Sequence, residues 1–301
     1  DDVNYVETYT AFSIRKMVSP SFYFDVLSFY KDGEGRADIY LKVGYDKLVF
    51  LKENEINVAR YNCRIMIINE DTDSILVNTE FEKKITIEEW KEEFNNYYDF
   101  NLKSFNLPNG YFIVSIKISD LNSTKSFSKL ERIVVNFSKD HNLQASDLLL
   151  VQKVNNQNGQ IKLSPMISKH IPFMRNDSLF SFYEVYSSQE KMVTITTNLV
   201  RLLFSSETDT EFITSYRNFD KYYLKPWEVK AYNNVYNETA DTVLKAGTNP
   251  LILKLAIALK PGSYLLYSKV KDREGKDSLL KHVRFTILPE GFPKIVSIDD
   301  K

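Results

Sequence analysis

The feature that most constrains the fold of this chain is a segment that occurs twice. Residues 107–133 and 259–285 align without a gap at an offset of 152 residues. In each copy a strand-like segment follows the glycine, then a polar turn opened by aspartate, then a second strand-like segment. The identical pairs include Gly110 with Gly262, Lys117 with Lys269, Asp120 with Asp272, Ser126 with Ser278, and Arg132 with Arg284. We interpret the copies as the terminal hairpins of two β modules, which either descend from one module or converged on one solution.

The start of each copy resembles the tyrosine corner of immunoglobulin-like sandwiches. In that motif, a tyrosine near the start of a late strand donates its phenolic hydrogen bond to the backbone a few residues upstream. The second copy carries the motif as Leu259, Pro261, Gly262 and Tyr264. The first copy carries Leu107, Pro108, Gly110 and Tyr111. The first copy fits less closely, because its tyrosine follows the glycine directly.

Alternation of apolar and polar residues with a period of two dominates the rest of the chain, and this pattern predicts strands. The predicted strands lie at 22–30, 37–43, 59–68, 74–81, 147–154, 178–187, 191–204, 227–236 and 250–259. Turn-forming Gly, Asn and Asp residues fall between the early strands, at 31–35 and 69–74, as expected for hairpins.

One short segment, 86–94, has the period of a helix instead. Ile87, Trp90 and Phe94 would share one helical face, while Thr86 and Glu89 have the spacing of a capping box. We therefore predict a short helix here, crossing the edge of the first sandwich.

A chain of 301 residues favours two domains. The apolar run at 147–154 indicates a strand of the second half, so the boundary is expected in the polar stretch 138–144. We predict an all-β fold of two tandem immunoglobulin-like antiparallel β-sandwich domains, residues 1–140 and 141–301, with one short helix in the first.

Composition excludes several classes of partner. The chain has 39 basic and 40 acidic residues, a net charge of −1 and no long run of one sign. It therefore lacks the basic footprint of a nucleic-acid-binding protein or a polybasic membrane patch. No apolar run reaches the ~18 residues of a transmembrane helix, and the first residues lack a signal-peptide pattern. A soluble or already processed form is expected.

The single cysteine, Cys63, cannot form an intrachain disulfide. It alternates with Tyr61, Ile65 and Ile67 along one predicted strand face. We interpret it as a small core residue rather than a reactive thiol.

No catalytic residue, metal site or cofactor is predicted. The three histidines, His141, His170 and His282, have no second ligand at metal spacing, and no nucleophile elbow or phosphate-binding glycine loop occurs. Four glutamates could imitate the carboxylate pair of a glycosidase, namely Glu88, Glu89, Glu92 and Glu93. Such clusters are usually solvent-exposed faces of helices. Four acids at turns are interpreted as hairpin residues rather than calcium ligands: Asp32, Glu34, Asp71 and Asp73.

Aromatic clusters are the best candidates for recognition. Tyr97 with Tyr98, and Tyr222 and Tyr223 with Trp227, lie beside Asn, Lys and Pro, a mixture that suits a contact face for protein or sugar. The alternative is that these rings are ordinary core and corner aromatics.

Three stretches, 23–50, 145–154 and 180–187, resemble the N-terminal region of the GWxTD domain-containing proteins of Bacteroidota. Two departures stand out: Gly44 replaces a frequent proline, and the Gly-Trp-x-Thr-Asp motif is missing, since Glu89 precedes Trp90 and Pro226 precedes Trp227. The helical domain carrying that motif would begin after about Ser297. The chain is therefore expected to be a truncated form, or a homologue without that domain.

The resemblance implies an exported protein of the periplasm or outer membrane, plausibly a lipoprotein with its lipid anchor outside this chain. Four Asp-Ser/Thr-apolar triplets resemble the O-glycosylation motif of exported proteins in that phylum, with ordinary turns as the alternative. The acceptors would be Ser74, Ser178, Thr242 and Ser278.

The expected function is that of a non-enzymatic scaffold or adaptor of the bacterial cell envelope. It would bind a protein partner in an outer-membrane-associated assembly through its sandwich surfaces and exposed strand edges. Two alternatives stay open. One is a carbohydrate-binding module that stacks glycans on Tyr222, Tyr223 and Trp227. The other is the accessory N-terminal region of an enzyme whose catalytic domain is not in this chain.

Overall fold

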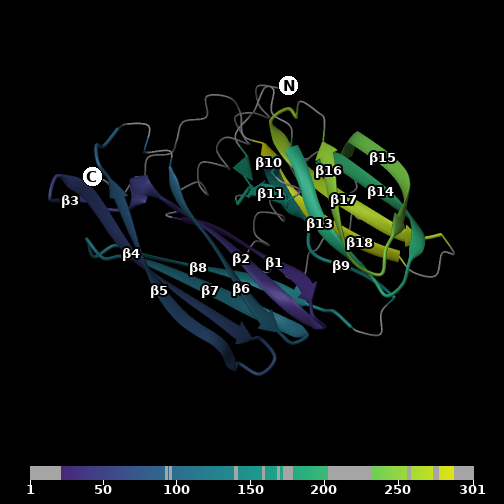
Figure 1. Ribbon diagram of the computed structural model, residues 1–301, viewed down its shortest axis with the longest axis horizontal. Coiled ribbons are helices and arrows are strands. Elements are labelled where there is room, and N and C mark those ends of the chain that lie inside the picture. Colours follow the sequence, from purple (N-terminus) through teal and green to yellow (C-terminus); the bar gives the residue numbers. More distant parts are fainter. Residues whose placement is uncertain are drawn as a thin grey trace, which may run out of the picture.

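The computed structural model describes residues 22–91, 94, 97–138, 142–157, 160–167, 170–171, 179–202, 232–255, 259–273 and 278–287. Strands in four sheets make up most of these residues (Figure 1). Within these ranges no helix is long and apolar enough to cross a membrane.

The first half of the chain forms two antiparallel sheets around one core. One sheet has the order β1-β2-β6, with strands β1 (Phe22–Lys31), β2 (Glu34–Gly44) and β6 (Tyr98–Leu107). The other has the order β3-β4-β7-β8, with β5 also paired to β4. Its strands are β3 (Leu51–Glu53), β4 (Ile56–Asn69), β5 (Ile75–Ile87), β7 (Gly110–Asp120) and β8 (Ser126–Val135), and the 3-10 turn η1 (Tyr45–Lys47) follows β2.

The second half forms two further sheets. The first has the order β11-β10-β13-β16, with β9 also paired to β13, and the second has the order β12-β18-β17-β14-β15. The strands of the first are β9 (Leu143–Ala145), β10 (Leu149–Gln157), β11 (Gln160–Pro165), β13 (Leu179–Ser187) and β16 (Gly247–Leu255). Those of the second are β12 (His170–Ile171), β14 (Lys191–Leu202), β15 (Tyr232–Leu244), β17 (Gly262–Asp272) and β18 (Ser278–Ile287).

The two halves share one strand order, and this confirms the predicted fold class. The path β1-β2-β6 corresponds to β10-β13-β16, and β4-β7-β8 with β5 corresponds to β14-β17-β18 with β15. The repeated segments form the last hairpin of each half in the same register. Gly110 pairs with Val135 in the first, and Gly262 pairs with Ile287 in the second. The predicted boundary after residue 140 falls between β8 and β9.

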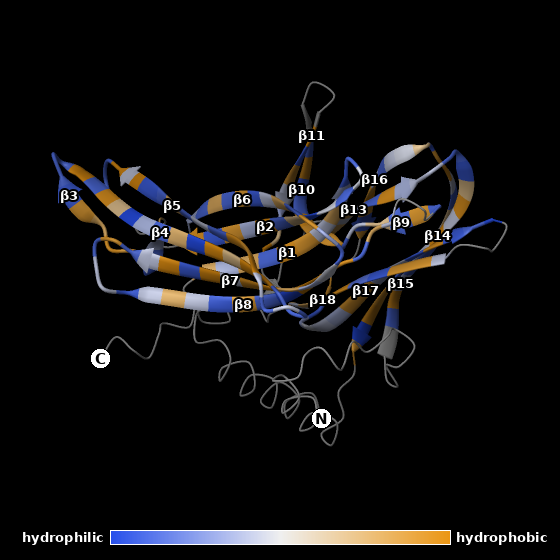
Figure 2. Cartoon of the chain, turned by 90° about the horizontal axis from the view of Figure 1, so that it is seen from below, coloured by the Kyte–Doolittle hydropathy of each residue, from blue (hydrophilic) through white to orange (hydrophobic). Residues whose placement is uncertain are grey.

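Alternating burial along the strands explains why these sequences form sheets. Tyr61, Cys63, Ile65 and Ile67 on β4 are all fully buried, as predicted from their spacing. Burial of apolar side chains at ~25 cal/mol per Å² is the main term that stabilises such a core. Bands of alternating hydropathy are visible along β4, β5 and β7 (Figure 2).

Among the described residues, the tyrosine corner is present in the second half and not in the first. The Tyr264 hydroxyl donates a 2.6 Å hydrogen bond to the backbone carbonyl of Lys260, and the ring is buried at 1% exposure. The equivalent position in the first half is the fully buried Phe112, which has no hydroxyl, whereas Tyr111 is 55% exposed. The first copy therefore keeps the hairpin without the corner bond.

The predicted helix at 86–94 is wrong. Thr86 and Ile87 end strand β5, where Ile87 pairs with Asn57 of β4. Ile85 and Ile87 are both buried. The alternation of the strand therefore continues into the first residues of the segment predicted to be a helix. Backbone pairing with β4 outweighs the local preference for a helical turn.

The two halves pack against each other through the outer faces of β1 and β2 and of β10 and β13. Tyr40 of β2 shares a buried cluster with Leu149 and Val151 of β10 and with Ile167. Polar contacts reinforce this seam: Asp147, between β9 and β10, accepts hydrogen bonds from both the backbone and the hydroxyl of Ser28 on β1. The seam places the two sandwiches side by side (Figure 2).

Candidate functional site

The structure separates the two tyrosines that the sequence analysis had grouped. Tyr97 and Tyr98 are both nearly half exposed, at 46% and 45%. Tyr97 contacts the rings of Tyr45 and Phe94, while Tyr98 lies against Tyr23. Tyr222, Tyr223 and Trp227 lie outside the described residues.

Tyr97 belongs to a group of five aromatic side chains at one end of the first sandwich. We call this group the aromatic surface cluster. Its members are Tyr45, Phe50, Trp90, Phe94 and Tyr97. Successive ring centroids are 4.9 to 6.3 Å apart, in the order Trp90, Phe50, Tyr45, Tyr97, Phe94 and back to Trp90. The contacts close into a ring of five side chains, at distances typical of favourable aromatic pairs.

The cluster is anchored on its inner side and exposed on its outer side. Tyr45, Phe50 and Phe94 are partly buried and pack against the core of the first sandwich. Trp90 is 39% exposed and Tyr97 is 46% exposed. Two exposed rings therefore stand on a packed aromatic base.

Backbone hydrogen bonds hold the segments that carry the cluster. The Tyr45 amide donates to the Tyr97 carbonyl at 3.0 Å, and the Tyr97 amide donates to the Phe94 carbonyl at 3.0 Å. Next to Tyr45 on η1, Lys47 and Asp46 form a 3.1 Å ion pair. These two side chains lie beside Gly44 and Tyr98.

Tyr98 lies in a second aromatic group on the outer face of β1, β2 and β6. Its ring is 6.2 Å from Tyr23 and lies under the Lys42 ammonium at 5.8 Å. The Lys129 ammonium lies 5.5 Å from the ring of Tyr23. Burial raises the pKa of Tyr23 to about 12 and lowers the pKa of Lys129 to about 8. This group links β8 to β1 and is interpreted as part of the packing of the sandwich.

The predicted glycan acceptors occupy different environments. Ser74 is exposed in the β4–β5 turn, where its hydroxyl lies 2.8 Å from that of Thr72. Ser278 is exposed at the start of β18, and Thr242 is half-buried within β15. Ser178 lies outside the described residues.

The residues weighed for catalysis or metal binding do not converge among the described residues. Glu88 and Glu89 are exposed, and Glu92 and Glu93 lie outside the described ranges. His282 is half-buried, and burial lowers its pKa. His141 and the side chain of His170 are outside the described part. Within the described part, no three His, Cys, Asp or Glu side chains lie close enough to hold a metal ion.

The sequence pattern predicts one exposed member of the aromatic surface cluster, Tyr97, for recognition, and it wrongly predicts a helix for Trp90 and Phe94. Tyr45 and Phe50 were missed. They come from the connection after β2, far from Trp90 in sequence, and only the tertiary fold brings them together. The two aromatic residues within positions 45–50 were the one signal in the sequence that pointed to this part of the cluster.

No protein-family model matches the chain, and no curated protein matches it. Solved structures do match. A transglutaminase from red sea bream is 8% identical with a TM-score of 0.24, over 89% of this chain and 31% of the transglutaminase. A β-glucuronidase from Bacteroides uniformis is 11% identical with a TM-score of 0.28, over 84% of this chain and 26% of that enzyme.

This chain therefore spans only a quarter to a third of the length of these two enzymes, at 26% and 31%. Identities and TM-scores this low carry no argument about what this chain binds or does.

Proposed function

We propose that this chain is a non-enzymatic scaffold or adaptor whose first sandwich binds a protein partner through the aromatic surface cluster. One observation supports the proposal most strongly: Trp90 and Tyr97 stay 39% and 46% exposed on top of a packed aromatic base. Tryptophan and tyrosine are enriched among interface residues that contribute ~2 kcal/mol or more to binding. They also lose little conformational entropy on binding, because their rings are rigid.

The join between the halves supports an adaptor role. Asp147 and Ser28 are hydrogen-bonded across the seam, and Tyr40 is buried in a cluster shared by both halves. A fixed join holds the exposed cluster in one orientation relative to the second sandwich. The second sandwich is then free to contact another component of the same assembly.

We also propose that the protein works in the bacterial envelope, as an exported and outer-membrane-associated component. The support is the resemblance of residues 23–50, 145–154 and 180–187 to GWxTD domain-containing proteins. Cell fractionation with an antibody to this chain tests the location. Recovery from the envelope fraction is the expected result, and recovery from the cytosol alone would contradict it.

Site-specific photo-crosslinking tests the binding surface. Tyr97 is replaced in living cells by a photoreactive phenylalanine analogue, and adducts are resolved by mass after irradiation. The matched control carries the same analogue at Tyr111, which is 55% exposed on β7 and outside the cluster. A discrete protein adduct from position 97, absent from position 111 and lost when Trp90→Ala is added, is the expected result.

Other outcomes of this experiment count against the proposal. Equal adducts from positions 97 and 111 would indicate non-specific collisions, and no adduct at position 97 would remove the cluster as a protein-binding surface. A polydisperse adduct that glycosidases digest would identify a glycan as the ligand instead.

A further inference from the structure

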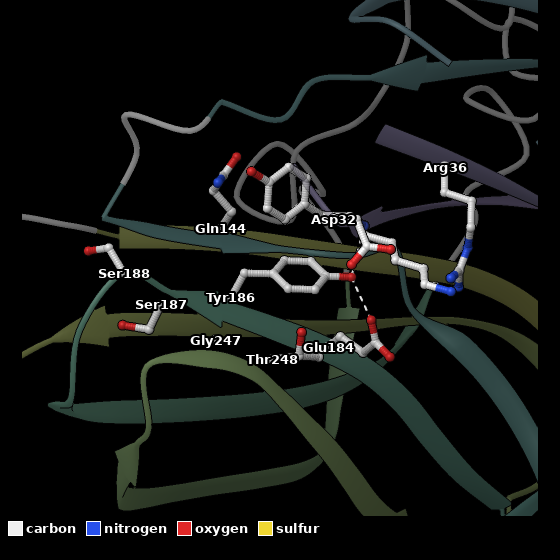
Figure 3. Close-up of a pocket in the computed structure, with 11 residues that line it drawn as sticks. Asp32, Arg36, Gln144, Glu184, Tyr186, Ser187, Ser188, Gly247 and Thr248 are labelled. Atoms are coloured by element: carbon white, nitrogen blue, oxygen red, sulfur yellow. Dashed lines mark hydrogen bonds between the residues drawn. The ribbon is translucent and has the colours of Figure 1, made fainter. Parts of the chain in front are cut away.

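A concave surface lies at the seam between the two halves, away from the aromatic surface cluster. It is a pocket of about 500 Å³. The β1–β2 hairpin forms one wall, with Tyr30, Asp32 and Arg36, and β9, β13 and β16 form the other (Figure 3). Its volume is in the range of sites for small ligands, which often lie at domain interfaces.

The floor of the pocket is preorganised by Tyr186. Its hydroxyl accepts a 2.9 Å hydrogen bond from the Tyr30 amide and donates a 2.6 Å hydrogen bond to the carboxylate of Glu184 (Figure 3). Its ring packs edge-on against Tyr30 at 5.4 Å and against Phe137 at 6.0 Å. The side chains of the floor are therefore ordered before a ligand binds, so binding loses little conformational entropy there.

The charges around the pocket nearly cancel. Arg36 is paired with Asp38 through two hydrogen bonds of 2.8 Å, and Asp38 is buried at 4% exposure. The remaining lining charges are Lys31, Asp32 and Glu184, and Glu184 already accepts from Tyr186. These three charges sum to −1, so the lining disfavours anions, and a cationic ligand is the alternative that the charged probes must exclude.

The rest of the lining is rich in neutral polar groups. It includes the hydroxyls of Ser187, Ser188 and Thr248, the amide of Gln144 and the ring of Tyr30. Protein contacts already orient three of these groups: Ser187 donates to the Gln189 carbonyl, Ser188 donates to the Asn142 side chain, and the Gln144 amide bonds the Ser138 backbone. A ligand would use the hydrogen-bonding capacity that remains on them. Next to Thr248, the space where a Cβ of Gly247 would lie has no atom within 4 Å, so the backbone is open there. Hydroxyls, an amide and carboxylates around an aromatic ring match a molecule with many hydroxyl groups and a weakly apolar face.

We propose that the pocket between the halves binds an uncharged polyhydroxylated ligand, a saccharide of one or two units. This proposal goes beyond the adaptor function and does not depend on the aromatic surface cluster. The two surfaces consist of different residues, so each proposal can be supported or contradicted independently of the other.

Ligand-observed NMR with the whole chain tests the proposal. The probes are a panel of neutral mono- and disaccharides, together with glucuronate and glucosamine as charged counterparts. We expect saturation transfer to at least one neutral sugar. Thr248→Trp, which fills the pocket, should weaken binding of that sugar at least tenfold, and Thr72→Trp, at an exposed turn outside the pocket lining, should not.

A second pair of variants keeps the test valid if Thr248→Trp disturbs folding. Asp32 is exposed with a φ of 52°, a conformation that asparagine tolerates. Asp32→Asn should weaken sugar binding severalfold, and the matched turn variant Asp71→Asn should leave it unchanged. Binding confined to a charged probe, binding that neither pocket variant weakens, or no binding across the whole panel would each overturn the proposal.

Discussion

Ser28 and Asp147 join the two halves of the chain by three hydrogen bonds. The Asp147 carboxylate accepts from the Ser28 amide at 2.8 Å and from the Ser28 hydroxyl at 2.7 Å. The Asp147 amide donates to the Ser28 carbonyl at 3.0 Å. Lys281 of β18 lies 3.1 Å from the same carboxylate. One short polar contact therefore ties β1 of the first sandwich to both sheets of the second.

Asp147→Ala should lower the free energy of unfolding by about 2 kcal/mol. Ser28 is only 2% exposed, so removing the carboxylate leaves its buried amide and hydroxyl without their partner. Urea unfolding followed by circular dichroism measures the change. Asp71→Ala, at an exposed turn, is the control and should change stability by less than about 0.5 kcal/mol. An equal effect of both variants would show that the contact across the seam does not stabilise the fold.

The stabilisation by Asp147 should disappear in acid. Burial alone would raise the pKa of Asp147, but Lys281 and the hydrogen bonds from Ser28 outweigh it and lower the pKa. A carboxyl whose pKa is lower in the folded state stabilises the fold above its unfolded pKa of about 4, and this contribution is lost as pH falls through the folded value. The stability difference between wild type and Asp147→Ala should therefore shrink below about pH 4. A difference that stays constant down to pH 3 would contradict this assignment.

Tyr264→Phe should destabilise the second half by about 1–2 kcal/mol. The variant keeps the buried ring and removes only the hydroxyl that donates to the Lys260 carbonyl at 2.6 Å. Thermal and urea unfolding measure the loss. Tyr111→Phe is the natural control, because Tyr111 is 55% exposed in the first copy of the hairpin. Similar losses in both variants would mean that the hydrogen bond from Tyr264 to Lys260 does not contribute measurably to stability.

Cys63 should resist thiol reagents until the protein unfolds. The side chain is fully buried, and burial raises the pKa of its thiol to about 12. A free cysteine has a pKa of about 8.5, so at pH 8 the folded protein should react with a disulfide reagent about a thousandfold more slowly than a free thiol. Full reaction in denaturant is the control. Rapid labelling of the native protein would show that the first core opens readily.

Much of the fold could be predicted from the sequence because its information is local or repeated. Alternation along residues 59–68 fixes which side chains of β4 point inward, and the 152-residue offset carries the same hairpin register into both halves. The helix at 86–94 was mispredicted because Ile87, Trp90 and Phe94 have a helical spacing, while Ile87 also continues the alternation of strand β5. Only the pairing of β5 with β4 decides between the two.

Most residues of the candidate sites could not be predicted from the sequence. Tyr97 was predicted as a recognition residue, but its partners Tyr45 and Phe50 lie some fifty residues earlier in the chain. The pocket joins Asp32 and Arg36 to Glu184 and Tyr186, which are separated by about 150 residues.

By itself, the sequence determined the all-β class of this protein, the inward face of β4 and the use of one hairpin in both halves. These properties follow from periodicity between neighbours along the chain. The tertiary structure decided which aromatic rings meet at the end of the first sandwich and how the halves join at Ser28 and Asp147. Packing and hydrogen bonding between distant segments depend on the whole chain's arrangement in space, which no local pattern encodes.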